Sequence, residues 1–453
     1  MDVRSVWGPT APEARRRAVV VRRAKPSPPE RYRRNPCGVH QRRISRHHPR
    51  RQPDTRHDGR PRRTDADQQE TNRMTTVPLP MPKTETDSYG HARMPRGFTA
   101  PEPDRVDRVA YGRYRNVYLY ITEACQLRCE HCYMGERLER ALKMNPQQII
   151  DTLTVWRKMG GDKLTVLGGE PTLHPFYVDS IKIASKIGYS HVITTTNAQQ
   201  PARRKFAQLE PSDFAYVQVS LDGGSAATHD AVRGPRTFDI AMETSEELCA
   251  RGFDTRIICT VNKANEGDVL NLLTIADEIG ASLVKFHVFS TIGTGHGNPD
   301  MAMTPPEWVD FCNRLEGVAP AHNTRVWFQP TYARRDQMDR YAAEGYQGCI
   351  GRTLDRISIF PDGRAYVCSY LFDTDMYLAR MKGNQVVLNR ETERNEFDLF
   401  TLPLVDNACG GCKSSACFGG CPAEEIVMGA SSCAEYPDIV PVCRLWKSSA
   451  KPE

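Results

Sequence analysis

The 453-residue sequence predicts an α/β fold in two parts: a partial barrel of six strand–helix units over about residues 115–295, then a small, loop-rich domain with a β-hairpin. Two observations lead to this prediction. From residue 115 onward, β-rich runs alternate with segments of helical periodicity, which is typical of parallel strands joined by right-handed crossovers. After about residue 325 the alternation stops and cysteines become frequent, as in a small domain that needs metal to support its core.

Each predicted element rests on a local pattern. Asn145 precedes the first helical run as an N-cap, and Gly168-Gly169 closes the second strand. Pro361-Asp362-Gly363 lies between two β-rich runs, 356–360 and 365–368, and predicts a hairpin. The predicted barrel strands are 117–122, 163–167, 191–195, 217–221, 256–261 and 283–289. The predicted helices are 146–159, 175–187, 237–251 and 269–279.

Charge and composition divide the chain into three predicted segments. Residues 1–113 are an extension and lead-in, 114–325 the barrel, and 326–453 the cysteine-rich domain. Residues 1–73 are rich in Arg and Pro and carry a net charge of about +12, so we expect them to be disordered. A nucleic-acid arm, a transit peptide or an untranslated stretch before Met74 would fit, and we favour the last. The remaining residues carry about −6, which does not indicate a nucleic-acid groove.

The composition also bears on the cell compartment. No run of 18 apolar residues indicates a membrane span, and the N-terminus lacks the apolar core of a secretory signal. We therefore expect a cytoplasmic protein whose thiols stay reduced. In that setting, 15 cysteines favour metal binding over disulfides.

The first cysteine cluster follows the first predicted strand. Cys125, Cys129 and Cys132 have C-x3-C-x2-C spacing. Three thiolates on one short loop can hold an iron–sulfur cube and leave its fourth iron open for a substrate or cofactor. A structural zinc site would need four ligands, and His131 would supply the fourth. From these residues alone, zinc stays the alternative.

The cluster and four later segments together resemble the radical S-adenosylmethionine (SAM) superfamily, which carries this cysteine spacing on the loop after its first barrel strand. The resemblance covers residues 115–295, and the segments occur in the family's order. They are Gly168-Gly169-Glu170-Pro171, Thr196-Asn197, Ser220-Leu221-Asp222-Gly223 and His229-Asp230-Ala231-Val232-Arg233-Gly234.

The resemblance implies roles for these residues. The three cysteines would hold a [4Fe–4S] cluster, and the implied reaction is reductive cleavage of SAM to methionine and a 5′-deoxyadenosyl radical that abstracts a substrate hydrogen. Glu170 would accept hydrogen bonds from the SAM amino group, and Arg233 would pair with the SAM carboxylate. Ser220 would contact the ribose, and His131 would lie beside the adenine. The other cofactor-binding residues implied are Gly168, Gly169, Asn197 and Asp222.

The C-terminal cysteines resemble the SPASM domain, which is seen in anaerobic sulfatase-maturating enzymes and many peptide-modifying radical SAM enzymes. The resemblance covers about residues 345–446 and implies two auxiliary [4Fe–4S] clusters; a zinc ribbon is the alternative. For the last ligand we prefer Cys443 to Cys433, because Cys443-Arg444-Leu445-Trp446 is similar to the family's closing segment. The first auxiliary cluster would be bound by Cys349, Cys368 and Cys421. The second would be bound by Cys409, Cys412, Cys417 and Cys443.

The functional prediction is a radical SAM oxidoreductase or maturase that modifies a ribosomally made peptide by crosslinking, dehydrogenation or epimerisation. The alternatives are the same chemistry on a small biosynthetic molecule, or formylglycine formation in a sulfatase-type protein. A different class would be a non-catalytic iron–sulfur electron-transfer protein. The expected partners are the peptide or small molecule, a reductase such as flavodoxin or ferredoxin, and a separate peptide-recognition protein, with no membrane and no nucleic acid.

Three further cysteines fit neither cluster pattern. Cys249 and Cys259 are predicted to be buried apolar residues. Either of them, or Cys312, would alternatively donate a hydrogen atom to a substrate radical. The segment 296–303, rich in Gly, Pro and Met, is predicted to approach the active site after the last barrel strand.

Overall fold

A computed structural model describes residues 114–328, 331–337, 340, 355–372, 374, 376–389, 436 and 438–441 of the chain. The first seven strands within these residues are β1 (Asn116–Thr122), β2 (Lys163–Gly168), β3 (His191–Thr196), β4 (Tyr216–Ser220), β5 (Thr255–Val261), β6 (Leu283–Val288) and β7 (Arg325–Phe328). The later ones are β8 (Tyr332–Arg334), β9 (Arg356–Ile359), β10 (Arg364–Tyr366), β11 (Ala379–Lys382), β12 (Gln385–Leu388) and β13 (Ile439–Pro441).

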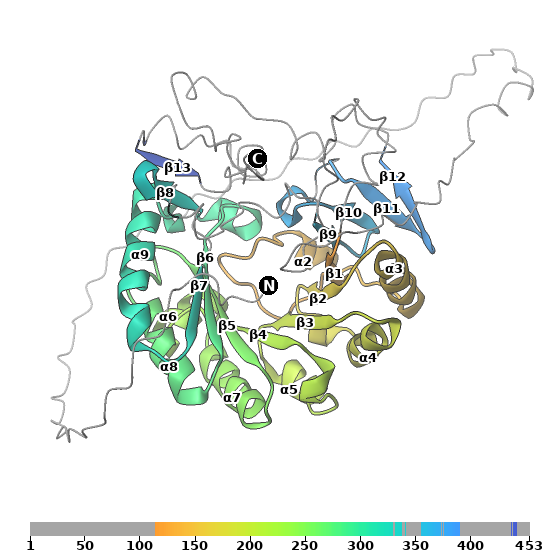
Figure 1. The fold of residues 1–453 in the computed structure, drawn as a ribbon, viewed down its shortest axis with the longest axis horizontal. Coiled ribbons are helices and arrows are strands. Elements are labelled where there is room, and N and C mark those ends of the chain that lie inside the picture. Colours follow the sequence, from red (N-terminus) through yellow and green to blue (C-terminus); the bar gives the residue numbers. More distant parts are fainter. Residues whose placement is uncertain are drawn as a thin grey trace, which may run out of the picture. The chain divides into compact units, whose positions relative to one another are not determined.

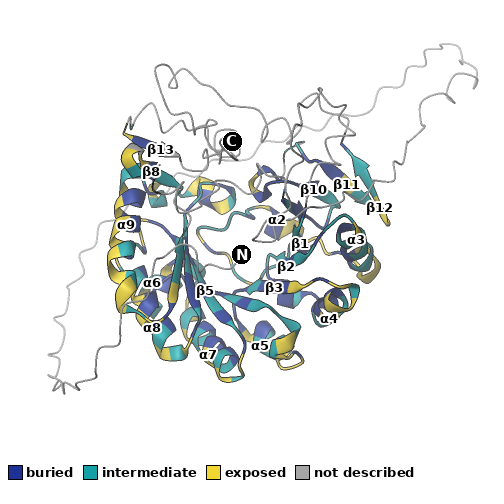
Figure 2. Ribbon diagram, in the orientation of Figure 1, coloured by how far each residue is buried: buried dark blue, intermediate teal, exposed yellow. Residues whose placement is uncertain are grey.

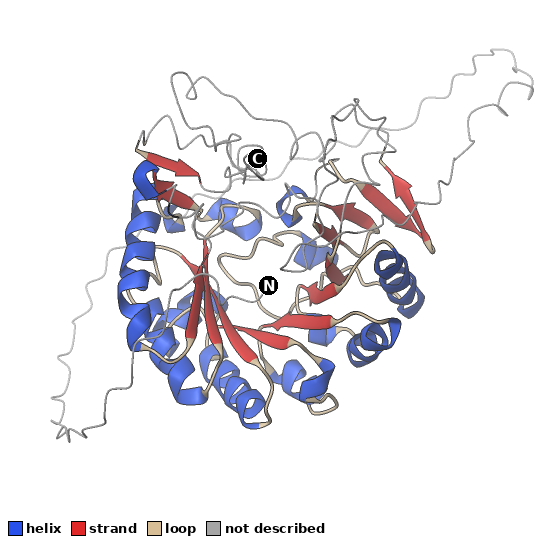
Figure 3. Ribbon diagram, viewed as in Figure 1, coloured by secondary structure: helices blue, strands red, loops and turns tan. Residues whose placement is uncertain are grey.

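Strands β1 to β7 lie side by side in chain order and pair in parallel, which confirms the predicted α/β fold (Figure 3). Strand β9 joins the other edge of β1 in parallel, and β10, β11 and β12 continue outward as antiparallel neighbours. The described strands thus form one sheet ordered β12-β11-β10-β9-β1-β2-β3-β4-β5-β6-β7, with β8 and β13 paired separately.

Helices cover the outer side of the strand arc, as Figure 1 shows for α3, α4, α5, α7 and α8. This arrangement follows from parallel pairing, because each crossover must return along one face of the sheet. The described helices are α2 (Arg137–Arg140), α3 (Pro146–Lys158), α4 (Tyr177–Ile187), α5 (Gln200–Phe206), α6 (Ala226–Arg233), α7 (Thr237–Ala250), α8 (Leu272–Ile279) and α9 (Pro305–Val318).

Local sequence explains where several helices begin and end. Asn145 caps α3 as predicted: its side chain accepts from Gln148 N–H at 2.9 Å, and the Gln148 side chain accepts from Asn145 N–H at 2.7 Å. Thr304 and Glu307 make the same reciprocal pair at the start of α9. Helix α4 ends at Gly188, whose φ of 101° suits a residue without Cβ.

The structure differs from the predicted elements in three respects. Helices α2, α5, α6 and α9 were not predicted. The first three are at most eight residues long, and the first turn of α9 contains two prolines, a composition typical of a loop. Helix α4 begins at Tyr177 instead of residue 175. Strands β9 to β12 extend the barrel sheet itself, although the sequence suggested a separate unit there. The predicted boundary at residue 326 falls inside β7 and stays a prediction.

Burial alternates along the barrel strands and distinguishes the two faces of the sheet. In β5, Ile257, Cys259 and Val261 are fully buried, whereas the residues between them are only partly covered. The buried set faces the helices, because side chains of successive strand residues point to opposite faces. Figure 2 shows the same contrast, with exposed positions gathered on the outer helix surfaces. The partly covered set lies on the inner face, toward which the functional residues described below also turn.

Candidate functional site

The predicted site residues come together at one edge of the sheet. Cys125, Cys129 and Cys132 lie on the loop after β1. Glu170, Asn197 and Asp222 lie within two residues of the ends of β2, β3 and β4. Parallel strands end at the same edge, so residues separated by almost a hundred positions in sequence become neighbours. Two groups of side chains flank the cysteine loop there.

Polar groups surround the sulfur atoms of two of the three cysteines. Leu127 N–H donates to Cys125 Sγ at 3.4 Å, and Asn197 Nδ2 lies 3.7 Å from the same sulfur. Arg233 Nη1 lies 4.0 Å from Cys129 Sγ. Burial raises the pKa of Cys125 to about 12 and that of Cys129 to about 11, and it also raises the pKa of Cys132. Because their pKa values are raised by burial, these thiols need a bound cation to ionise near neutral pH.

The loop after β6 supports the far end of the cysteine loop. Thr294 N–H donates to the carbonyl of Cys132 at 2.9 Å, and Asn298 Nδ2 donates to the carbonyl of Glu130 at 3.1 Å. Gly293, with φ of 64°, lies so close that an added Cβ would be 2.5 Å from the Cys132 carbonyl oxygen. Asn298 belongs to the segment 296–303 that was predicted to approach the active site, and it contacts the cysteine loop.

The first flanking group, here called the glutamate side, consists of Gly168, Gly169, Glu170, Thr172, Thr196 and Asn197. Its two glycines let the end of β2 lie against the start of the cysteine loop. A Cβ on Gly169 would be 2.5 Å from the Glu123 carbonyl oxygen and 2.6 Å from that of Ala124. Two backbone hydrogen bonds also stabilise this contact: Gly169 N–H donates to Thr122 O, and Glu170 N–H donates to Ala124 O.

Uncharged donors hold the buried carboxylate of this side. Glu170 is 1% exposed. Its Oε1 accepts from Thr172 N–H at 3.1 Å, Thr172 Oγ1 at 2.6 Å and Thr196 Oγ1 at 2.9 Å, while Oε2 accepts from Asn197 N–H at 2.8 Å. Burial outweighs these bonds and raises the pKa of Glu170. The carboxylate therefore joins β2 to β3, and its predicted contact with the SAM amino group stays a prediction.

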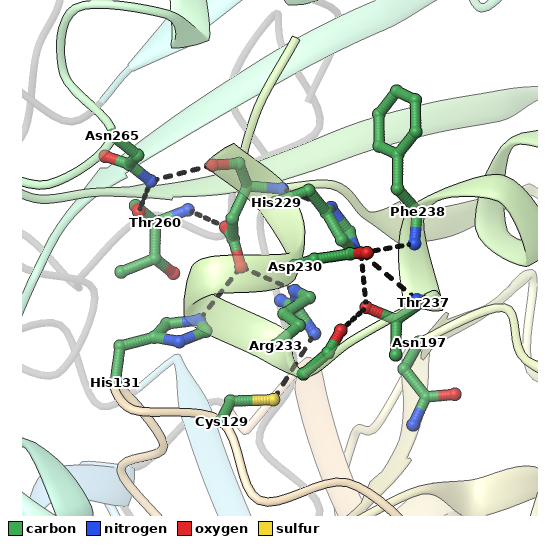
Figure 4. A network of polar contacts seen from close by, with 12 residues as sticks. Cys129, His131, Asn197, His229, Asp230, Arg233, Thr237, Phe238, Thr260 and Asn265 are labelled. Atoms are coloured by element: carbon green, nitrogen blue, oxygen red, sulfur yellow. Dashed lines mark hydrogen bonds and ion pairs between the residues drawn. The ribbon is translucent and has the colours of Figure 1, made fainter. Parts of the chain in front are cut away.

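The second flanking group, here called the aspartate side, consists of Asp222, His131, His229, Arg233, Thr260 and Asn265. Figure 4 shows His131, Arg233 and Thr260 turned toward one another. The Asp222 carboxylate contacts all three of these residues. Asp222 Oδ2 accepts from Arg233 Nε at 2.5 Å and lies 3.1 Å from His131 Nε2; Oδ1 accepts from Thr260 N–H at 2.7 Å. Burial opposes ionisation, but Arg233 and His131 hold the pKa of Asp222 well below its usual range.

This arrangement orients Arg233 toward the cysteine loop. Its Nε is bonded to Asp222, so the end of the guanidinium extends to Cys129. The planar group has donors left for an acceptor beside the cluster loop. Ser220, the last residue of β4, is 8% exposed on the same side.

Sequence reasoning missed Thr260 and Asn265 of the aspartate side, and it named His229 only as part of a motif, without a role. Asn265 Nδ2 donates to the carbonyls of Asp222 at 3.0 Å and Thr260 at 2.9 Å, and His229 Nδ1 accepts from Asp222 N–H at 3.2 Å. Burial, followed by the charge of Arg233, lowers the pKa of His229 to about 4. Thr260 lies near the end of β5 and Asn265 four residues after it, where no sequence pattern had marked a site. The available signal was their place at the end of a predicted strand and in the loop that follows.

A chain of hydroxyl groups connects the cysteine loop to the hairpin region. Tyr133 Oη donates to Tyr120 Oη at 2.9 Å, and Tyr120 Oη donates to Ser369 Oγ at 3.2 Å. Tyr133 directly follows Cys132, and Ser369 directly follows Cys368, which is buried. Ser369, the residue after Cys368, is therefore connected by hydrogen bonds through two tyrosines to the cysteine loop.

The other predicted cysteines divide into two groups. Cys259 and Cys312 are buried, and Cys249 is partly buried in α7. This agrees with the apolar prediction for Cys259, whose pKa is raised well above its usual value by burial and the nearby Asp222. The remaining predicted cluster ligands lie outside the described residues: Cys349, Cys409, Cys412, Cys417, Cys421, Cys443 and the alternative Cys433.

The donor set at the cysteine loop fits an iron–sulfur cluster better than a single zinc ion. His131, the fourth ligand that zinc would need, turns its Nε2 to Asp222. Three thiols with N–H donors beside two of them match the surroundings that tune iron–sulfur clusters. Among the described helices, none has the length and apolar content to cross a bilayer.

Comparison with known proteins shows what the region around this site is similar to. Residues 119–276 match the model of the radical SAM superfamily. Mycofactocin maturase MftC from Mycobacterium tuberculosis is 24% identical over 344 residues, which cover 73% of this chain and 85% of MftC. The AdoMet-dependent heme synthase of Methanosarcina barkeri is 24% identical over 341 residues, or 71% of this chain and 94% of the synthase.

Solved structures share the fold at lower identity. Streptococcus suis SuiB bound to S-adenosylmethionine has a TM-score of 0.56 at 15% identity, over 70% of this chain and 74% of SuiB. SuiB bound to its precursor peptide SuiA has a TM-score of 0.54 at 14% identity, over 79% of this chain and 83% of SuiB. The radical SAM superfamily, whose model residues 119–276 match, implies a [4Fe–4S] cluster and SAM as cofactors.

Proposed function

We propose that this chain, whose residues 119–276 match the radical SAM superfamily, is an oxidoreductase or maturase that modifies a ribosomally made peptide. The observation that carries the proposal is the cysteine loop itself: three thiols with Arg233 and Asn197 directed at two of the sulfur atoms. A bound [4Fe–4S] cluster would supply one-electron reduction of SAM, yielding a 5′-deoxyadenosyl radical that removes a substrate hydrogen.

The chain's own residues have separate tasks in this proposal. Cys125, Cys129 and Cys132 hold the cluster and leave one iron open. Arg233, fixed by Asp222, binds the SAM carboxylate, because its guanidinium can present two donors to one carboxylate. Gly168 and Gly169 let the backbone approach the cysteine loop closely. The SAM amino group, ribose and adenine are assigned to Glu170, Ser220 and His131.

We further propose two auxiliary [4Fe–4S] clusters in the C-terminal domain. Cys368 supports this proposal, since it is buried and lies one residue from the hydroxyl chain that leads to Tyr133. An auxiliary cluster near the first one would remove an electron from a product radical, as dehydrogenation or a new bond requires. A flavodoxin or ferredoxin is the proposed electron donor to the enzyme.

The proposed substrate class draws on the relatives. MftC is named a maturase, and SuiB was solved with a precursor peptide. A second candidate, chemistry on a small biosynthetic molecule, is favoured by the heme synthase match, which spans 94% of that protein. A gene for a short peptide beside this one, and a change in the mass or stereochemistry of that peptide on incubation with the enzyme, would distinguish the first candidate from the second.

The decisive experiment is anaerobic reconstitution with iron and sulfide, followed by dithionite and SAM. Iron content and 5′-deoxyadenosine are then measured. We expect about twelve irons per chain, from three clusters of four, with deoxyadenosine release. Cys129→Ser should lose about four irons and all release, whereas Cys249→Ser, outside the proposed ligands, should retain both. Zinc in place of iron, with no SAM cleavage, would refute the proposal.

A further inference from the structure

Strand β6 carries two basic side chains on the inner face of the sheet. Phe286 points to the helices, since its ring lies 5.7 Å from that of Phe311 in α9. Its neighbours Lys285 and His287 must therefore point to the opposite face. In Figure 1, β5, β6 and β7 lie side by side with α8 and α9 outside them. Both basic residues thus face the interior of the arc.

Strand register places these residues beside the proposed SAM site. Ser220 pairs with Ile258, Ile258 with Lys285, and Lys285 with Trp327, so the four form one row across the sheet. Lys285 lies two strands from Ser220, about 10 Å at ordinary strand spacing. His287 belongs to the next row, opposite Thr260, whose N–H binds Asp222.

The charge of Lys285 is not balanced within the described residues. Its Nζ lies 4.4 Å from the centre of the Trp327 ring, and that part of the chain offers it no carboxylate within ion-pair distance. Asp254, an acid near the same strands, is already bonded to Arg256 at 2.7 Å and to Ser282. Lys285 is partly buried. A cation held there without a counter-charge is costly to stability, so a site of this kind indicates a ligand that supplies one.

Neighbouring cations add to the uncompensated positive charge around Lys285. Burial, followed by the charges of Arg356 and Arg256, lowers the pKa of Lys285 to about 8. Burial and the Lys285 charge hold the pKa of His287 well below 6.5. At neutral pH Lys285 is therefore mostly a cation, and His287 is a neutral ring that can donate one N–H. Trp327 contributes an aromatic surface next to the amine.

We propose that Lys285, with His287 and Trp327, binds a carboxylate group of the substrate on the inner face of the barrel. This inference rests on the proposed function, since it names the substrate's chemistry at the same site. Both β6 residues lie on the rows that lead to Ser220 and Asp222. A carboxylate held there would fix the substrate next to SAM, and an amide or ester of the same shape would be held less well.

The test uses the full-length protein without a known substrate. Lysines are labelled with trace acetic anhydride from pH 6 to 11, and each site is measured by mass spectrometry, with benzoate and benzamide as matched probes. We expect the midpoint for Lys285 near pH 8 without probe, and an upward shift of roughly one unit with saturating benzoate, because an opposite charge stabilises the ammonium. Benzamide should leave it unchanged, as should both probes for exposed Lys182 on α4.

Variants and a third probe give the contradicting outcomes. Lys285→Met should remove benzoate binding measured by calorimetry, Lys285→Arg should retain it, and Lys182→Met should match the unaltered protein. A Lys285 midpoint near 10.5 that benzoate does not move, or equal protection by benzamide, would overturn the carboxylate site. Protection by inorganic phosphate at lower concentration than benzoate would replace the carboxylate with a phosphate. None of these measurements requires SAM cleavage, so failure of the proposed function would be seen separately.

Discussion

The glutamate side and the aspartate side hold buried carboxylates after the ends of two parallel strands, β2 and β4, which β3 separates in the sheet. Yet their chemistry is opposite. Glu170 is bonded by hydroxyl and backbone N–H groups alone, and burial raises its pKa. Asp222 has the same burial but faces Arg233 and His131, and its pKa is lowered. A buried acid therefore becomes a fixed charge only where a cation accompanies it.

The glutamate side and the aspartate side therefore have different roles in the site. Neutral hydrogen bonds on the glutamate side define backbone position, because they join β2, β3 and the base of the cysteine loop. The ion pair on the aspartate side sets the direction of a charge, the Arg233 guanidinium, toward Cys129. Geometry is thus controlled on one side of the cysteine loop and electrostatics on the other.

The largest effect is expected from breaking the ion pair. Asp222→Asn leaves Arg233 buried without its counter-charge, so the free energy of unfolding should fall by about 3–5 kcal/mol. Urea unfolding of the cluster-free protein measures this loss. Asp239→Asn, on an exposed position of α7, should change it by less than about 0.5 kcal/mol. Equal losses in both variants would mean that the aspartate side is not held by charge.

A smaller effect is expected from the backbone contact of the glutamate side. Gly169→Ala would bring a Cβ to 2.5 Å from the Glu123 carbonyl oxygen, so the strand end and the cysteine loop must separate. We expect a loss of about 1–3 kcal/mol, together with lower iron loading on reconstitution. Gly267→Ala is the matched control, since its Cβ would meet nothing within 4 Å. Normal iron loading in Gly169→Ala would show that the close approach is dispensable for the cluster loop.

Sequence alone predicted the fold and the cysteine loop because both depend on local order. Alternating segments mark parallel strands, and the three cysteines lie within eight residues. Contacts between distant segments were less accessible. Nothing near Thr260 or Asn265 signals that both would meet Asp222, because only the pairing of β4 with β5 brings them together.

Lys285 and Glu170 illustrate the same limit for chemistry. In sequence, Lys285 is one lysine within an apolar strand, and its isolation from acids appears only when the neighbouring strands are placed. Glu170 was assigned to SAM by resemblance, whereas the folded chain gives it four donors of its own. A motif specifies which residues occur, but the fold decides which of their atoms are already occupied.

The smallest effect is expected for Glu170→Gln. This substitution tests directly whether the pKa of Glu170 is raised while that of Asp222 is lowered. The folded pKa of Glu170 is raised above its unfolded value, so the native state gains protons, and the stability that this carboxyl contributes falls as pH rises through the folded pKa. The substitution should therefore lower the free energy of unfolding more at pH 5 than at pH 8. At pH 8 we expect a loss of about 1 kcal/mol, because Gln replaces the carboxylate acceptor imperfectly. Asp222 has a lowered pKa, and its carboxylate loses its contribution only as pH falls below about 3.8. Urea unfolding at both pH values, with exposed Glu246→Gln as control, measures the trend. A penalty for Glu170→Gln that grows with pH would mean that Glu170 is stabilised as an anion, and the two sides would then share one chemistry.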